Sequence, residues 1–224
     1  MSIKLVVLDM AGTTVADENA VAKAFISAFQ KSRFTISEAN VNPLMGYKKT
    51  TAIQKVLEQL GTNPTDELIE NIHTTFTREM IAYYESSDSV KPTPYAEEML
   101  HWLKEKGIRV AMNTGFPRVI ADTIMERFQW QERGLVDDYI ASDEVENGRP
   151  HPSMIRQLME YAGVDDPGEV AKIGDTESDI HEGRNASCGL VIGITSGTFS
   201  REELVAHQPD YIIDTLQELQ DLIR

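Results

Sequence analysis

The chain has 224 residues, which is enough for one substantial core or for a core domain of about 150 residues with a smaller domain beside it. Its 21 basic and 36 acidic residues give a formal net charge of -15, which argues against nucleic acid or an anionic membrane surface as a partner. Cys188 is the only cysteine, so no disulfide can form within the chain, and we expect a reducing compartment, the cytoplasm.

The first predicted element is a buried strand at residues 3–8, where aliphatic and β-branched side chains run into Asp9 and Gly12. A run of this length is too short for a membrane span or a signal sequence, and we expect neither. The strand therefore ends in a tight loop and begins an α/β pattern.

Residues 17–86 interrupt that pattern, because they contain helical periodicity and no strand signal. Helices are expected at 20–31, 50–60 and 66–84. We predict an inserted helical domain over residues 17–86 and a core domain made of residues 1–16 and 87–224. The outgoing linker at 14–17 and the stiff return segment at 90–94 would lie side by side and act as a hinge.

The rest of the chain alternates between short apolar runs and helical patterns with apolar residues at three-to-four spacing. Strands are expected at 109–112, 139–141, 170–173, 190–194 and 211–213, and helices at 95–106, 120–129, 154–162 and 180–186. This alternation predicts an α/β fold, with a parallel sheet flanked by helices.

Aspartates follow two of the predicted strands directly: Asp9 ends the first run, and Asp175 follows the run at 170–173. In parallel sheets, ligands bind beyond the carboxyl ends of the strands, so these side chains should meet at one edge. They would repel each other unless a cation neutralised them, which indicates a hard ion such as Mg²⁺. Asp179, on the helix that starts there, could hold a metal-bound water or could cap the helix.

Candidates for binding a phosphoryl group follow other strands in the same way. Thr114 offers a hydroxyl, Gly115 a backbone N–H and Arg149 a permanent cation, and Gly12 lies in the loop after Asp9. Taken singly, Thr114 and Gly115 could belong to an ordinary loop and Arg149 could lie on the surface. The ordered set favours a phosphoryl-transfer site.

These segments resemble the four motifs of the haloacid dehalogenase-like hydrolases. The matching segments are Asp9-Met10-Ala11-Gly12-Thr13-Thr14, Asn113-Thr114-Gly115, Arg149 and Gly174-Asp175-Thr176-Glu177-Ser178-Asp179. The resemblance implies a Rossmann-like core, a mobile helical cap, and an aspartyl-phosphate intermediate at Asp9. It also implies Mg²⁺ on Asp9, Asp175 and the backbone carbonyl of Ala11, a small phosphorylated or phosphonate substrate, and a homodimer formed through the cap.

Ala11 stands where most phosphatases of that family carry a second aspartate, which protonates the leaving group. Without that aspartate, hydrolysis of an ordinary phosphate ester would lose a contribution of roughly 10² to 10⁴ in rate. The sequence Asp-x-Ala-Gly-Thr-Thr resembles the phosphonatase subgroup, which cleaves a carbon–phosphorus bond with the help of a Schiff-base lysine in the cap.

Lys49 lies three residues after the pair Met45-Gly46, the spacing that the resemblance implies for that lysine. Crowding by Lys48 or desolvation under the cap could lower the pKa of its amine enough for attack on a carbonyl. Lys48 and Lys49 could also be a solvated helix start. Three positions depart from the subgroup pattern, because Ala52, Phe116 and Met10 replace an expected histidine, tyrosine and tryptophan.

The leading hypothesis is therefore a Mg²⁺-dependent phosphonatase-like hydrolase acting on phosphonoacetaldehyde or a related carbonyl phosphonate. An alternative is a phosphatase for small esters with good leaving groups, which could do without the acid at Ala11. A dehalogenase fits less well, because it has no need of Asp175 and Asp179. A non-catalytic binding protein would have no need of a nucleophile at Asp9. The five histidines are scattered and show no metal-binding spacing.

Overall fold

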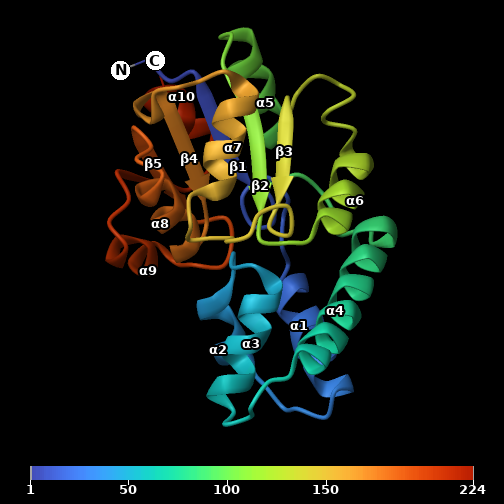
Figure 1. The fold of residues 1–224 in the computed structure, drawn as a ribbon. Coiled ribbons are helices and arrows are strands. Elements are labelled where there is room, and N and C mark those ends of the chain that lie inside the picture. Colours follow the sequence, from blue (N-terminus) through green and yellow to red (C-terminus); the bar gives the residue numbers. More distant parts are fainter. Residues whose placement is uncertain (1, 224) are drawn as a thin grey trace.

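The computed structural model describes residues 2–223, and in this part of the chain six parallel strands form one sheet in the order β3-β2-β1-β4-β5-β6. The strands are β1 (Leu5–Asp9), β2 (Arg109–Thr114), β3 (Asp138–Ala141), β4 (Val170–Gly174), β5 (Leu190–Ile194) and β6 (Tyr211–Ile213). Helices flank the sheet, which confirms the predicted Rossmann-like α/β fold (Figure 1).

Strand β1 lies inside the sheet, between β2 and β4, and all five of its residues are buried. Val6 and Leu8 pack into the core on one side of the sheet, and Leu5 and Val7 pack into the core on the other side. Strands β2 and β4 pair with its two edges. The carboxyl end of β1, Asp9, therefore lies between the ends of its two neighbours.

The core helices contribute apolar faces to these two layers. They are α5 (Ala96–Glu105), α6 (Arg118–Phe128), α7 (Ser153–Ala162), α8 (Glu177–Asn185), α9 (Arg201–Ala206) and α10 (Leu219–Leu222), with single turns η2 (Pro167–Glu169) and η3 (Leu216–Glu218). The four longer helices were predicted within a few residues. Helices α9 and α10 were not, because each is too short to show a helical period. No helix within residues 2–223 combines the length and apolar character that crossing a membrane requires.

A second group of helices lies between β1 and α5 in the chain. They are α1 (Ala20–Lys31), α2 (Glu38–Val41), η1 (Asn42–Leu44), α3 (Lys49–Gln59) and α4 (Asp66–Ser86). Figure 1 places them beyond the carboxyl ends of the strands, below the sheet. The predicted helices at 20–31, 50–60 and 66–84 correspond to α1, α3 and α4, whereas α2 and η1 were missed. The division into core domain and cap domain at residues 17 and 86 stays a prediction.

The two linkers run beside each other. Val15 forms isolated β-bridges with both Ala11 and Pro92, and the N–H of Ala16 donates to the carbonyl of Lys91 over 3.0 Å. The N–H of Thr93 donates to the carbonyl of Thr14 over 2.9 Å. The adjacent linkers agree with the sequence prediction, while hinge motion between them stays a prediction.

Aromatic side chains join the inserted helices to the core. The ring of Phe76 on α4 lies with its centroid 5.5 Å from Phe25 on α1 and 6.2 Å from Phe116, which follows β2. Tyr84, near the end of α4, packs edge-on against Phe116 at 6.1 Å. These contacts make one continuous apolar core across the two parts of the chain.

Phe76 is therefore expected to be a stability residue. Phe76→Ala should lower the free energy of unfolding by about 3–5 kcal/mol, because it leaves a cavity where a fully buried ring contacted two others. Urea unfolding followed by circular dichroism measures this. Tyr161→Ala is the control, because Tyr161 is 52% exposed and its removal should change stability by no more than about 0.5 kcal/mol. Equal losses in both variants would contradict the packing argument.

Candidate active site

Three buried aspartates meet at the carboxyl edge of the sheet. Asp9 ends β1, Asp175 directly follows β4, and Asp179 lies in the first turn of α8. Each offers a carboxylate oxygen within 4.8 Å of the other two. The juxtaposition follows from the parallel pairing of β1 with β4, which was the basis of the sequence prediction.

The negative charge of this cluster is only partly neutralised by protein groups. Burial raises the pKa of Asp175 well above its usual range, and the charges of Asp9 and Asp179 raise it further. The backbone N–H of Thr198, which donates to Asp175 over 2.7 Å, offsets little of this. Burial also raises the pKa of Asp9, to about 6, against the opposing effect of Arg149. Such a set fits a divalent cation, which would favour the ionised form of both carboxylates.

Arg149 lies inside the protein, so the surface interpretation of this residue is wrong. Its Nη1 lies 2.6 Å from Asp9 Oδ1 and 3.0 Å from Asp179 Oδ1, and its Nε lies 3.0 Å from Glu182 Oε2. Its Nη2 donates to the carbonyl of Asn113 over 2.7 Å. The guanidinium is thus fixed against the proposed nucleophile by contacts on every side.

Two cations and the hydroxyl of Thr176, the residue that precedes α8, hold the carboxylate of Asp179. Lys172 Nζ lies 2.8 Å from its Oδ1, and the hydroxyl of Thr176 donates to its Oδ2 over 2.6 Å. Burial alone would raise its pKa, but Arg149 and Lys172 outweigh that effect and lower it. All of these contacts are with side chains and none is with a backbone N–H of α8, which does not support the helix-capping alternative.

Sequence reasoning missed two residues of this network, Lys172 and Glu182, and gave Asn113 only as part of a motif. Glu182 accepts hydrogen bonds from Asn113 Nδ2 over 3.0 and 2.8 Å, and Lys172 Nζ donates to Asn113 Oδ1 over 2.8 Å. All three side chains are buried. The available signals were a lysine within the apolar strand β4 and a glutamate three residues after Asp179, on the same helix face.

A cavity opens between the aspartates and the inserted helices. Its lining includes Asp9, Ala11, Asp17, Lys49, Thr114, Gly115 and Asp175. The Thr114 hydroxyl accepts a hydrogen bond from the N–H of Phe116 over 3.2 Å. Gly12 and Arg149 do not line this cavity: Gly12 lies against the Asp175 carboxylate, and Arg149 Nη1 lies 2.6 Å from Asp9 Oδ1.

Lys49, the first residue of α3, reaches this cavity from the inserted helices. Its side chain is buried, with Nζ 3.3 Å from the carbonyl of Tyr47 and 5.2 Å from the ring centroid of Phe116. The solvated-helix-start interpretation is therefore wrong for Lys49. Burial lowers the pKa of the amine to about 8, against the attraction of Asp9. Lys48 does not crowd it, because Lys48 Nζ donates to the carbonyl of Val145 over 3.0 Å.

Asp17 was missed as a site residue, although it lines the same cavity. Its Oδ1 accepts the N–H groups of Ala20 and Val21 over 2.7 and 3.2 Å, which fixes the carboxylate at the start of α1. Burial raises its pKa, while these N–H groups and Lys49 lower it. This half-buried carboxyl and the buried amine of Lys49 line the same cavity, where each can act on a proton of a bound substrate.

Comparisons with known proteins place this site in a family. The sequence profile of the haloacid dehalogenase-like hydrolases matches residues 3–187. The chain belongs to the haloacid dehalogenase-like hydrolase family. A relative, the phosphonoacetaldehyde hydrolase of Bordetella pertussis, is 30% identical over 254 residues, covering 97% of this chain and 90% of that protein. The resemblance seen in the motifs is confirmed.

Two solved structures share the fold of this hydrolase with a TM-score of 0.82. One is a phosphonoacetaldehyde hydrolase-like protein from Oleispira antarctica, 20% identical, in a match covering 100% of this chain and 92% of that chain. The other, described as a predicted phosphoglycolate phosphatase from Haemophilus somnus, is 22% identical, with 99% and 98% covered. Because proteins with different described activities fit the fold equally well, the fold alone does not identify the substrate.

Beside the cavity, the inserted segment of this hydrolase meets the core at two glycines, where the absence of a Cβ allows close approach. A Cβ atom on Gly115 would collide with the carbonyl oxygens of Gly46 and Tyr47. Gly46 has a φ of +79°, and a Cβ there would collide with Ser178 Oγ. The segment before Lys49 therefore rests on the loop that follows β2 and on the first turn of α8.

Gly115→Ala should force this contact open and move Lys49 away from the cavity. We expect kcat/KM to fall by about 10²-fold, the cost of a misplacement of about 1 Å at a catalytic centre. Steady-state phosphate release from a phosphonate or phosphate-ester substrate measures it. Gly193→Ala is the control, because the atoms nearest to a Cβ there belong to the Leu204 side chain, the closest at 3.3 Å. Unchanged kinetics in Gly115→Ala would show that the closed contact is not needed for turnover.

Proposed function

We propose that this hydrolase cleaves the carbon–phosphorus bond of phosphonoacetaldehyde or a related carbonyl phosphonate, through an aspartyl-phosphate at Asp9. One observation carries the proposal: a buried lysine amine with a pKa of about 8 faces the same cavity as Asp9. Ala11, which lines that cavity, has no group that could protonate an ester oxygen. The site thus has an amine suited to a carbonyl and lacks the usual acid for an ester.

The chemistry of the leaving group explains why this combination matters. A carbanion is a poor leaving group, so direct attack on a phosphonate is slow. If the carbonyl beside the departing carbon first condenses with Lys49, with loss of water, the resulting iminium accepts the electron pair released from the carbon–phosphorus bond. Lys49 then carries an enamine, and no acid at position 11 is required.

In the proposed reaction, Asp9 takes the phosphoryl group while Lys49 retains the carbon fragment. A carboxylate oxygen of Asp9 forms a bond to phosphorus as the carbon–phosphorus bond breaks. The electron pair of the broken bond passes into the enamine on Lys49. The enamine carbon takes up a proton, and hydrolysis of the imine frees acetaldehyde. A second water hydrolyses the aspartyl-phosphate to phosphate and restores Asp9.

The remaining residues would bind and orient the phosphonate. In the proposed site, Asp9, Asp175 and the backbone carbonyl of Ala11 would hold Mg²⁺, and Asp179 would assist through a water molecule. The ion would neutralise charge on the phosphoryl oxygens. Thr114 and Gly115 line the cavity and offer a hydroxyl and an N–H to those oxygens, while Arg149 fixes the orientation of the Asp9 carboxylate.

Reductive trapping tests the imine. With phosphonoacetaldehyde, Mg²⁺ and sodium borohydride, we expect a two-carbon or phosphonoethyl adduct on Lys49, located by peptide mass spectrometry, and loss of activity. Lys49→Arg should remove the adduct and lower turnover by about 10²-fold or more, since arginine cannot form the imine. Lys48→Arg is the matched control and should retain both, because arginine can still donate to the carbonyl of Val145.

Two results of this experiment would contradict the proposal. The first is full turnover of the phosphonate by Lys49→Arg. The second is phosphate release from phosphate esters alone, with no adduct and with faster turnover in Ala11→Asp, which would support the ester phosphatase instead.

The pH dependence of trapping provides a separate test. Because only the neutral amine attacks a carbonyl, adduct formation should rise with pH, reach half its maximum near the Lys49 pKa of about 8, and level off above it. An exposed lysine would reach half-maximum near pH 10.4, roughly the value in model peptides. Phe116→Ser, which admits water beside the amine, should move the midpoint upward. A midpoint near 10 in the unmodified enzyme would contradict the effect of burial.

A further inference from the structure

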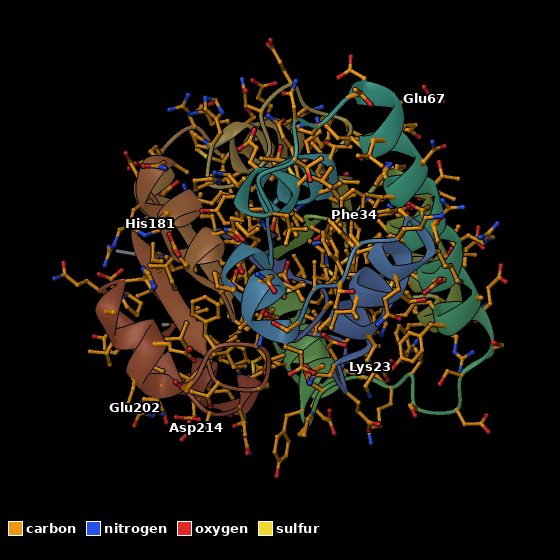
Figure 2. All side chains as sticks on the ribbon, turned by 90° about the horizontal axis from the view of Figure 1, so that it is seen from below. Lys23, Phe34, Glu67, His181, Glu202 and Asp214 are labelled. Carbon is orange, nitrogen blue, oxygen red and sulfur yellow. The ribbon has the colours of Figure 1, made fainter. Side chains whose placement is uncertain are left out.

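Three side chains that are scattered in the sequence come together on the outer side of α8. Glu177 and His181 lie one helical turn apart on α8, and His207 directly follows α9. His181 Nε2 lies 3.3 Å from His207 Nδ1 and 3.8 Å from Glu177 Oε1. Figure 2 shows His181 at the rim of the molecule, on the opposite side from Glu67 of α4. This cluster is separate from the aspartates of the active site.

The three groups form a recognised ligand set for zinc. One ligand atom from each side chain lies within 4.8 Å of the other two. Two nitrogens bound at about 2.0–2.1 Å to a tetrahedral ion lie roughly 3.3–3.4 Å apart, which is the separation of the two imidazole nitrogens here. Imidazole nitrogens with a carboxylate favour zinc and similar transition ions over Mg²⁺, which prefers oxygen ligands.

The backbone around His207 is fixed against α8 independently of any ion. Arg184, one turn beyond His181, donates to both carboxylate oxygens of Asp210 over 3.1 and 2.8 Å and to the carbonyl of Gln208 over 2.8 Å. The ring of Phe199 packs 6.0 Å from the ring of His207. A site whose ligands are already positioned loses less conformational freedom when it binds.

We propose that Glu177, His181 and His207 bind a divalent transition-metal ion of the zinc class, with water in the fourth position. The half-buried side chains leave the site accessible to solvent, and the net charge of -15 favours cation binding. The ion would link α8, whose inner face carries Asp179 and Glu182, to the chain between α9 and β6.

Isothermal titration of the metal-free full-length protein with zinc chloride tests the proposal. Excess Mg²⁺ is present to occupy the aspartate site. We expect one zinc per chain, with affinity at least tenfold weaker in His181→Ala and in His207→Ala. Loss of a group that only hydrogen-bonds to a metal ligand already weakens metal binding by about tenfold or more, and here a ligand itself is lost. His101→Ala, which replaces an exposed histidine on α5 outside the cluster, should bind as the unmodified protein does.

One further variant and one further measurement distinguish zinc binding at the histidine cluster from binding at the aspartates and from loss of folding. Asp175→Asn should retain zinc at the histidine cluster, and both histidine variants should melt without metal at the temperature of the parent, since neither imidazole is buried. Absence of zinc binding under excess Mg²⁺, unchanged affinity in His207→Ala, or loss of binding in Asp175→Asn would each overturn the proposal.

Discussion

The structure of this site depends on the concentration of negative charge at the carboxyl edge of the sheet. Asp9, Asp175, Asp179 and Glu182 are all buried there, and the cations in direct contact with them are Arg149 and Lys172. Burial of a carboxylate is costly unless it is paired, so these contacts hold β1, β4, α8 and the loop containing Arg149 in one arrangement. The excess charge remains near Asp175, where a divalent ion fits.

Much of the fold could be read from the sequence because parallel strands buried on both faces appear as continuous apolar runs. Residues 3–8 and 170–173 were found for that reason, and Asp9 and Asp175 were found because they end such runs. Short helices were missed because a single turn carries no period. The positions of His181 and His207 could not be inferred either, since tertiary packing alone brings α8 and α9 together.

The site residues that were missed show a second limit of prediction from sequence. A lysine in a strand or a glutamate in a helix has an ordinary surface interpretation, so Lys172 and Glu182 gain meaning only when their partners are known. Lys49 was found through a spacing that resembles a known subgroup, but its burial required the structure. In the proposed function, the choice of substrate depends on that amine together with Ala11, and two residues of this kind cannot be inferred from the shared fold.

The contact between Gly115 and Gly46 also limits how this enzyme can change over evolution. At this point the two parts of the chain meet through main-chain atoms, so there is no side chain that mutation could enlarge or trim to fit another substrate. Adaptation of the pocket must instead occur at lining positions with side chains, such as Val21, Met45 and Phe116. The glycines fix how closely the two parts of the chain approach each other, and these three positions supply apolar side chains that substitution can resize.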